Sequence, residues 1–314
     1  MREDPRLFDY RPYENRPKIA WPNGARVAFW VVPNIEFYEL RPPVNPYRPS
    51  WPRPVPDVAG YAARDYGNRV GHDRMMRVMD EFGVRGSVSL STAVCEHHPE
   101  LIEACAERDW EFFSHGIYNT RYTYGMSEAQ EREMIEDAVA TIKKHTGQQC
   151  KGYLTPALTH SEHTMDLFAE AGGIYTCDLF HDDQPTPVHV RSGKKFVSIP
   201  YSMELNDFFA FLVNGRSPRA FGRMVREGFD RLFAEAESDD TGVVLCLSLH
   251  AYLIGQPHRL RVLEEVLDYV SNHRDVWMTT GAEIATHYIE HSYDRAVAAP
   301  GYEANNNMSP RRNG

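Results

Sequence analysis

Short, nearly continuous apolar runs alternate along the chain with longer segments of helical periodicity. The runs that predict buried strands lie at residues 26–33, 84–90, 110–113, 151–153, 174–177, 197–200, 242–249 and 276–280. The segments that predict helices lie at 70–82, 93–108, 127–147, 163–171, 217–236, 257–271 and 281–291. No linker interrupts this alternation. It therefore predicts an α/β protein built as one (β/α) barrel of about seven strands.

Three segments fall outside the alternation. Residues 1–24 predict an extended arm, and the barrel domain itself is expected at 25–291. Residues 40–60 contain seven prolines, which favour an ordered loop over a helix or a central strand. The aromatic and arginine side chains of this loop suit either a lid over a pocket or a contact between subunits. Residues 292–314 are polar and predict a disordered tail.

Composition narrows the class of protein. The chain of 314 residues is 42% apolar, which is enough for a sizeable core. Its net charge of −10 and its scattered basic residues favour neither nucleic acid nor a membrane surface as a partner, so we expect a small or neutral substrate. No signal segment or long apolar window occurs, and we expect a cytoplasmic protein. The five cysteines form no CxxC pair and predict reduced core thiols without a catalytic role.

Polar side chains follow several predicted strands at their carboxyl ends, where barrel enzymes keep their chemistry. Glu36 follows the first strand, His115 and Asn119 the third, Asp178 the fifth and His250 the long strand at 242–249. One histidine among aromatic residues is more often structural than functional, but the other strand ends strengthen the functional interpretation. Such a cluster could hold a metal ion or divide acid and base roles, and both suit amide hydrolysis.

Other motifs are absent or ambiguous. The chain has no GxSxG elbow, no glycine-rich phosphate loop and no HExxH, so serine hydrolases, nucleotide-binding enzymes and zincins have no support. The segment with Arg64, Tyr66 and Arg69 could orient a polar planar substrate, or could form a salt-bridged structural turn. Of Asp182 and Asp183, we expect one to line the pocket and one to cap a turn. Candidates for supporting roles after the sixth strand are Glu204, Asn206 and Asp207.

A series of short motifs along the chain carries a resemblance to a known family. In chain order the motifs are VPNIE, RDYGNRVG, SHGIYNTRY, GYLTPALT, CDLFHDDQP, VSIPYSMELND, LSLHAYLIGQP and VWMTTGAEIATHY. With these motifs the chain resembles the polysaccharide deacetylase superfamily with its NodB-like domain over roughly residues 20 to 290. Within it, the chain is similar to the allantoinase-like branch, which includes metal-independent allantoinases and cyclic imide hydrolases. The resemblance implies a distorted barrel and a homo-oligomer, either a dimer or a tetramer.

The chain departs from the deacetylase pattern at positions that matter for metal binding. Asn34 stands where the family keeps its base aspartate, and Glu36 stands at the metal-aspartate position. His115 matches the first metal histidine, Asn119 replaces the second, and Leu154 replaces an arginine. Because asparagine is a weak zinc ligand, the resemblance implies either no cofactor or one divalent metal such as zinc, held by Glu36 and His115.

The resemblance implies a hydrolase of non-peptide carbon–nitrogen bonds, and we expect its substrate to be a small cyclic amide, ureide or imide. The expected catalytic residues are Glu36, His115 and His250, with Glu36 or His250 activating water and His115 polarising the carbonyl group. Expected substrate-binding residues are Asn34, Arg64, Tyr66, Arg69, Asn119, Asp178, Asp183 and Glu204. The alternatives are a metal-dependent carbohydrate N-deacetylase and a barrel that binds a small ligand without catalysis.

Overall fold

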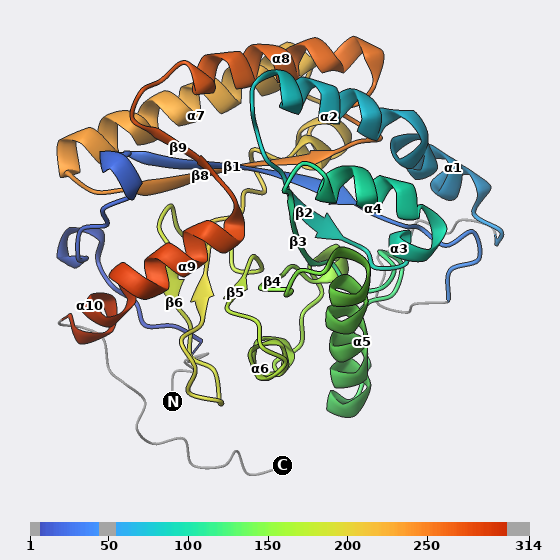
Figure 1. Ribbon diagram of the computed structural model, residues 1–314, viewed down its shortest axis with the longest axis horizontal. Helices are drawn as coiled ribbons and strands as arrows, with labels where there is room; N and C mark the ends of the chain where they lie inside the picture. The colour runs from blue at the N-terminus through green and yellow to red at the C-terminus, as the bar shows by residue number, and fades with distance from the viewer. Residues whose placement is uncertain (1–6, 44–54, 300–314) are drawn as a thin grey trace.

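The sheet in the computed structural model of the protein is strongly curled and forms a half-barrel (Figure 1). The structure describes residues 7–43 and 55–299. Its strands run in the order β6-β7-β5-β4-β3-β2-β1-β8, and β9 also pairs with β1. All pairs are parallel except that of β6 with β7. The expected α/β fold with a distorted barrel is thereby confirmed.

The strands are β1 (Val27–Ile35), β2 (Ser87–Leu90), β3 (Glu111–Ser114), β4 (Gly152–Tyr153), β5 (Tyr175–Thr176), β6 (Thr186–Pro187), β7 (Val197–Ser198), β8 (Val243–His250) and β9 (Val276–Thr279). The sequence predicted all of them except β6, which accounts for the larger number of strands. Four are only two residues long. Continuous pairing therefore centres on β1 and β8, which are nine and eight residues long and fully buried.

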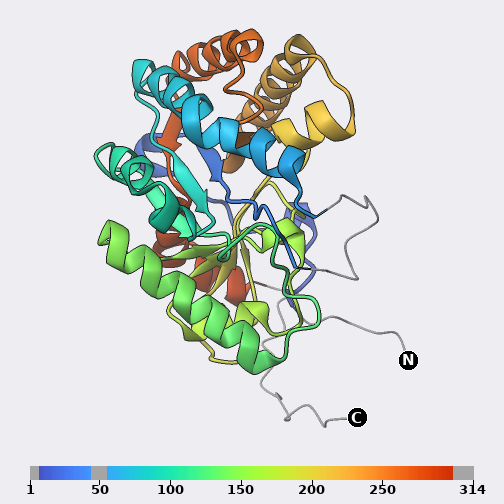
Figure 2. The same ribbon diagram turned by 90° about the vertical axis from the view of Figure 1, so that its right-hand side faces the viewer.

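The α-helices are α1 (Val58–Tyr66), α2 (His72–Glu81), α3 (Val94–His97), α4 (Pro99–Ala106), α5 (Glu128–Thr146), α6 (Thr164–Glu170), α7 (Pro218–Asp239), α8 (Pro257–Ser271), α9 (Gly281–His291) and α10 (Tyr293–Ala298). Short 3₁₀ helices are η1 (Tyr13–Asn15), η2 (Pro22–Gly24) and η4 (Pro156–Leu158), and single π turns are η3 (Gly67–Gly71) and η5 (Phe209–Val213). Helices α2, α7 and α8 lie together over one side of the sheet, and α5 lies along another (Figures 1 and 2).

Alternation along the strands decides which side chains enter the barrel. On β1, Val27, Phe29 and Val31 belong to the core between sheet and helices, whereas Ala28, Trp30 and Val32 belong to the inner core. A strand has a period of two, so Asn34 and Glu36 continue the inner row. β8 is aligned with β1 so that Asn34 pairs with His250. The two strands thus deliver their last polar side chains to the same mouth.

Helix termini follow the local sequence signals. Ser127 caps α5: its hydroxyl accepts from the Gln130 amide nitrogen, and the Gln130 side chain accepts from the Ser127 amide nitrogen in return. Gly147 ends α5 with φ +72°, a conformation that glycine adopts without strain. The capping box and the glycine stop that the sequence predicted for this helix are confirmed.

Three segments differ from the sequence predictions. The single helix expected at 93–108 is split at His98, because Pro99 lacks an amide proton and begins a new helix, α4. The loop expected at 40–60 ends earlier, since Asp57 accepts from the Gly60 amide nitrogen and starts α1. Part of this loop, 44–54, lies outside the described residues. The tail expected from 292 begins with α10, whose Ala296 is buried against the inner core.

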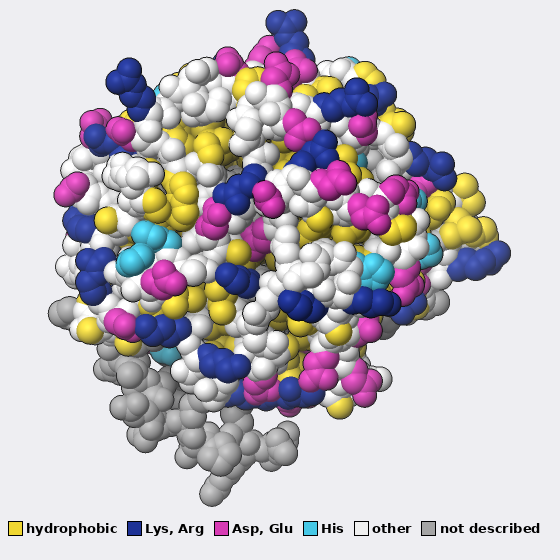
Figure 3. Space-filling model, viewed as in Figure 1, with side chains coloured by type: hydrophobic (Ala, Val, Ile, Leu, Met, Phe, Trp, Pro, Cys, Tyr) yellow, Lys and Arg dark blue, Asp and Glu magenta, His cyan; other side chains and the backbone are white. Residues whose placement is uncertain are grey.

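On the face seen in Figure 3, acidic and basic side chains are interspersed. No helix within 7–43 and 55–299 is long and apolar enough to cross a membrane. The five cysteines are buried and free, and burial raises the pKa of each thiol, in keeping with the expected core role.

Candidate active site

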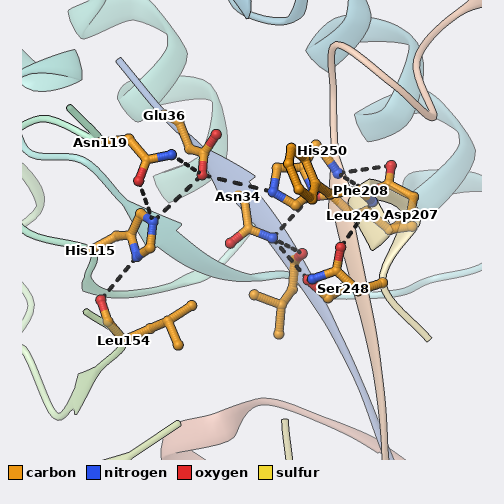
Figure 4. A network of polar contacts seen from close by, with 12 residues as sticks. Asn34, Glu36, His115, Asn119, Leu154, Asp207, Phe208, Ser248, Leu249 and His250 are labelled. Atoms are coloured by element: carbon orange, nitrogen blue, oxygen red, sulfur yellow. Dashed lines mark hydrogen bonds and ion pairs between the residues drawn. The ribbon is translucent and has the colours of Figure 1, made fainter. Parts of the chain in front are cut away.

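Glu36 is the central side chain at the mouth of the barrel. Its Oε1 atom lies 3.5 Å from His115 Nε2, 3.7 Å from His250 Nε2 and 2.7 Å from Asn119 Nδ2, which donates to it. Figure 4 shows His115 and Asn119 on one side of this carboxylate and His250 on the other. The second oxygen, Oε2, is buried and has no hydrogen-bond partner among the described residues. Glu36 therefore keeps one oxygen engaged and one available.

The charge of Glu36 is stabilised by its neighbours. Burial by itself raises the pKa of Glu36, but the positive charge of His250 and the hydrogen bond and charge of His115 outweigh burial and lower it. The carboxylate side chain is 5% exposed, so water screens these interactions weakly. Glu36 is consequently a buried carboxylate that stays ionised.

His115 is held on both sides. Its Nδ1 atom lies 2.9 Å from the Leu154 carbonyl oxygen, and Nε2 lies 3.1 Å from Asn119 Oδ1. The Asn119 amide is fixed in this orientation because its Nδ2 atom donates to Glu36 and, at 2.6 Å, to the Tyr38 hydroxyl group. Both ring nitrogens of His115 thus face oxygen acceptors.

His250 is oriented by a buried carboxylate from the segment after β7. Asp207 Oδ1 lies 2.7 Å from His250 Nδ1, and the Asp207 oxygens also accept from the backbone nitrogens of His250 and Ile254. Burial by itself lowers the pKa of His250, but the negative charge of Glu36 and the hydrogen bond to Asp207 raise it overall. The pairing fixes the proton on Nδ1 toward Asp207. Nε2 is left pointing toward Glu36.

Asn34 belongs to the wall of the site. Its Nδ2 atom lies 3.0 Å from Ser248 Oγ and 3.2 Å from the Leu249 carbonyl oxygen, both on β8. The Tyr201 hydroxyl group lies 2.5 Å from the same Ser248 oxygen and 3.4 Å from Asn34 Oδ1. An amide bound in this way ties β1 to β8. It accepts no proton at neutral pH, so the base must be another residue.

These residues open into a cavity of about 250 Å³. Six of the predicted site residues line it: Asn34, Glu36, Arg64, His115, Asn119 and His250. The remaining wall is mostly aromatic and apolar, formed by Tyr38, Tyr122, Leu154, Ala157, Leu158, Tyr201, Asn206, Phe208 and Phe209. The cavity therefore combines a small polar cluster with flat apolar walls, as small-molecule sites do.

The other predicted binding residues lie outside this cavity. Tyr66 accepts from Arg74, and Arg69 is exposed and paired with Asp65. Asp178 turns inward to accept from the amide nitrogen and hydroxyl group of Thr155. Asp183 and Glu204 are exposed. Arg69, in η3, thus belongs to the salt-bridged turn that was one of the two sequence interpretations, whereas Arg64, in α1, lines the cavity.

Sequence reasoning did not commit to several residues that the fold brings to the site. Tyr38 follows Glu36 by two positions, and the period-two pattern could have identified it. The sequence predicts a supporting role for Asp207, and the structure identifies its partner as His250. Tyr201 and Phe208 come from segments between strands and carried no signal in the sequence.

The donor set at this mouth does not fit the metal ion that deacetylases bind. A metal on His115 needs a lone pair on Nε2, but this atom faces the Asn119 carbonyl oxygen. The Glu36 oxygen nearest to His115 accepts a hydrogen bond from the Asn119 amide. Within 7–43 and 55–299, no group of three or more His, Cys, Asp or Glu side chains could hold a metal ion. Asn119, at the position of the second metal histidine, connects His115 and Glu36 through hydrogen bonds.

A second cavity, of about 290 Å³, lies beneath the N-terminal arm and is lined by residues such as Phe8, Arg16, His181 and Tyr288. Its Arg16 is paired with Asp182 at 2.6 Å. His181 is the one histidine among its described lining residues, so this cavity has no carboxylate between two histidines as Glu36 is. The mouth around Glu36 is therefore the candidate active site.

Comparison with known proteins gives consistent results. A family model described as polysaccharide deacetylase matches residues 61–175. The structure of the PuuE allantoinase is similar with a TM-score of 0.79 and 27% identity, covering 88% of this chain and 95% of that one. A probable polysaccharide deacetylase from Pseudomonas aeruginosa has a TM-score of 0.78 and 28% identity, covering 88% and 96%. A peptidoglycan deacetylase from Helicobacter pylori is 23% identical over 257 residues, 72% of this chain and 86% of that protein.

Proposed function

Because this chain belongs to the polysaccharide deacetylase family, whose members hydrolyse carbon–nitrogen bonds, we propose that it opens a small cyclic amide, ureide or imide with water. The observation that carries the proposal is the Glu36 carboxylate, held ionised between two histidines with Oε2 free of any partner among the described residues. A free carboxylate oxygen beside a proton donor is the arrangement that general acid–base hydrolysis needs.

Glu36 is the base of the proposed reaction. Its Oε2 atom takes a proton from a water molecule while the water oxygen adds to the carbonyl carbon of the ring. The lowered pKa keeps Glu36 ionised at neutral pH, so it is ready to accept this proton. Asn34, at the position where deacetylases have an aspartate, serves as a fixed part of the wall.

His250 is the acid. Its raised pKa and its bond to Asp207 keep a proton on Nε2, which faces the cavity. As the tetrahedral intermediate collapses, the ring carbon–nitrogen bond breaks and this proton passes to the leaving nitrogen. The new carboxylic acid releases its proton to solvent, and the proton on Glu36 passes to His250, which restores both groups for the next turnover. His115 lines the same cavity, and its Nε2–H turns from Asn119 Oδ1 to the carbonyl oxygen as the negative charge of that oxygen develops.

The cavity favours a small planar substrate over a polymer. At about 250 Å³ it lies below the roughly 300 to 1,000 Å³ usual for ligand sites. Phe208, Phe209 and Tyr201 supply flat walls on which a five- or six-membered ring can stack. A polysaccharide chain would need an extended groove.

A substrate panel tests the proposal. Purified protein is incubated with allantoin, hydantoin, succinimide, dihydrouracil and chitooligosaccharides, and ring opening or acetate release is followed by NMR. We expect ring opening of at least one cyclic compound, with oxygen-18 from labelled water in the product carboxylate. Chelation with EDTA should leave the rate unchanged. Acetate release alone, abolished by chelation, would overturn the proposal.

The similarity to a peptidoglycan deacetylase favours N-deacetylation as the second candidate. The same panel separates the two functions, because only deacetylation releases acetate. A third outcome also has a clear meaning. Saturable binding of a cyclic compound with no turnover between pH 5 and 9 would indicate a barrel that binds ligands without catalysis.

A further inference from the structure

Arg64 is a cation of the cavity wall without a carboxylate partner. It comes from the last turn of α1 and lines the cavity together with Glu36 and Tyr38. Among the described residues, no carboxylate lies within 4.0 Å of its guanidinium group, although Arg121 nearby is paired with Glu39 at 2.8 Å. Arg64 has no such ion pair, and the nearest site carboxylate, Glu36, acts on it only through longer-range electrostatics.

The guanidinium group of Arg64 is held in place by two aromatic rings. Its central carbon lies 4.7 Å from the centre of the Tyr38 ring and 5.4 Å from that of Tyr252. Contacts of this kind fix the plane of the guanidinium group and reduce the entropy lost on binding a ligand. The tyrosines orient the charge without neutralising it. Arg64 is therefore preorganised toward the cavity.

Two buried polar groups at and behind this wall lack a hydrogen-bond partner among the described residues. Arg64 Nε and the Tyr252 hydroxyl group are both buried and have no hydrogen-bond partner in the part of the chain that the structure describes. Leaving such groups unpaired costs free energy, which a ligand with acceptor oxygens recovers. Neither carboxylate of the site lies within ion-pair distance of Arg64 among the described residues, and Glu36 Oε2 is the atom that the proposed reaction needs as its base. Glu36 lies between His115 and His250, and Asp207 is bound to His250.

We propose that Arg64 binds a carboxylate group carried by the substrate, so that the preferred substrates are cyclic amides, ureides or imides with an acidic substituent. The inference rests on the proposed function for the identity of the ring. A carboxylate matches the planar guanidinium group with two parallel hydrogen bonds, and it would give Arg64 the ion pair that it lacks among the described residues. Half-burial of Arg64 protects this pair from solvent screening.

The first experiment measures binding without catalysis. Cyclopentanecarboxylate and its neutral isostere, cyclopentyl methyl ketone, contain no hydrolysable bond and are titrated by NMR into wild type, Arg64→Gln, Arg64→Lys and Arg121→Gln. We expect wild type to bind the carboxylate at least about tenfold more tightly than the ketone. Arg64→Gln should abolish this preference, Arg64→Lys should keep part of it, and the matched control Arg121→Gln should keep all of it.

Two results would overturn the inference. One is an equal affinity of wild type for the two ligands, and the other is a carboxylate preference that survives Arg64→Gln. Thermal unfolding shows whether each variant is folded, and Arg64→Lys retains the charge if the glutamine variant is unstable. Raising the salt concentration from 20 to 200 mM should weaken carboxylate binding to wild type and leave ketone binding unchanged.

A second experiment separates this inference from the proposed function. Hydrolysis of dihydrouracil is compared with that of its 6-carboxylate in wild type and Arg64→Gln. We expect wild type to have the higher kcat/KM for the acid, and the variant to lose at least about tenfold more on the acid than on the neutral ring. If neither compound is hydrolysed, the proposed function is wrong for dihydropyrimidine rings. The binding titration then decides by itself whether Arg64 binds a carboxylate.

Discussion

Two buried glutamates, Glu36 and Glu111, lie at opposite ends of the barrel in nearly equal burial, at 7% and 8% exposed. Glu36 follows β1 at the carboxyl end of the sheet, and Glu111 begins β3 at the amino end. Glu111 shares the inward row of β3 with Phe113, which belongs to the inner core, and with His115, which lies at the mouth. One row of side chains thus connects a structural carboxylate with a residue of the active site.

The two carboxylates differ in how their oxygens are used. Glu111 Oε1 accepts from the Tyr175 hydroxyl group, and Oε2 accepts from the Ser87 hydroxyl group and from the Ala282 amide nitrogen at the start of α9. Burial raises the pKa of Glu111 despite these bonds, whereas the histidines lower that of Glu36. A carboxylate whose oxygens are all bound stabilises a fold. One that keeps a free oxygen beside proton donors can do chemistry.

Exchange of Glu36 for glutamine should have the largest effect. Glu36→Gln preserves shape but cannot accept a proton, so we expect kcat on the ring substrate to fall by about 10³-fold or more, which is about 4 kcal/mol. The free energy of unfolding should fall by about 1 kcal/mol, because the surroundings stabilise the ionised carboxylate more than burial destabilises it, as its lowered pKa indicates. Steady-state kinetics and urea unfolding measure the two quantities. A variant that keeps a tenth of the wild-type rate would remove Glu36 from the mechanism.

Exchange of Glu111 for glutamine, at the amino end of the sheet, should lower the stability of the fold and leave the activity unchanged. In Glu111→Gln an amide group replaces one acceptor oxygen and faces the donors Tyr175, Ser87 or Ala282, which we expect to cost about 2 to 3 kcal/mol. Urea unfolding measures this loss, and kcat and KM at a temperature where the variant is folded should stay within about twofold. If the Glu111 variant instead lost activity at full stability, the contrast between the two ends would be wrong.

Asp207→Asn should test how His250 is held. Removing the negative charge weakens the support of the imidazolium form, so we expect kcat to fall about 10- to 100-fold. As the acid, His250 must be protonated, so activity is lost as pH rises through its raised pKa. The variant has a lower His250 pKa, and its activity should decline at a lower pH than that of wild type. A pH–rate profile shows this shift, which a merely structural role of Asp207 would not produce.

The acid side of the same profile tests the base. Glu36 must be ionised, so activity is lost as pH falls through its pKa, which lies below the ordinary value near 4.5. Wild-type activity should therefore extend well below pH 5 if the fold persists there. Loss of activity above pH 5, with the protein still folded by circular dichroism, would contradict the assignment of Glu36.

The smallest effect on stability is expected for a carboxylate at the surface, which serves as a reference for the two buried glutamates. Glu170 pairs with Arg191 at 2.5 Å and with Arg132 at 2.8 Å, and the hydrogen bond from Arg191 lowers its pKa to about 2. Because solvent screens this pair, Glu170→Gln should cost less than about 1 kcal/mol at pH 7. The folded-state pKa is depressed, so the contribution is present above pH 4.5 and is lost as pH falls toward 2. If Glu170→Gln lowered the free energy of unfolding as much as Glu111→Gln is expected to, burial would not determine how much a carboxylate contributes to stability.

Much of the secondary structure could be predicted from the sequence. The continuous apolar character of β1 and β8 predicted buried strands, and the signals at Ser127 and Gly147 predicted both ends of α5. These features depend on local sequence and on strand or helix period, which any stretch of about ten residues reveals. The placement of Glu36, His115 and His250 at strand ends was predicted for the same reason, since parallel strands bring their carboxyl ends to one edge.

What the chain alone determined was which residue types stand at the strand ends, because strand period and position along β1, β3 and β8 are properties of local sequence. What only the tertiary structure decided was how those residues are paired. Asn119 reaches Glu36 across 83 positions, and Asp207 reaches His250 across 43. It also turned Arg64 toward the cavity and left Arg69 in a surface ion pair. Hydrogen bonding and charge balance depend on distances of a few ångströms between segments remote in sequence, and folding alone sets those distances.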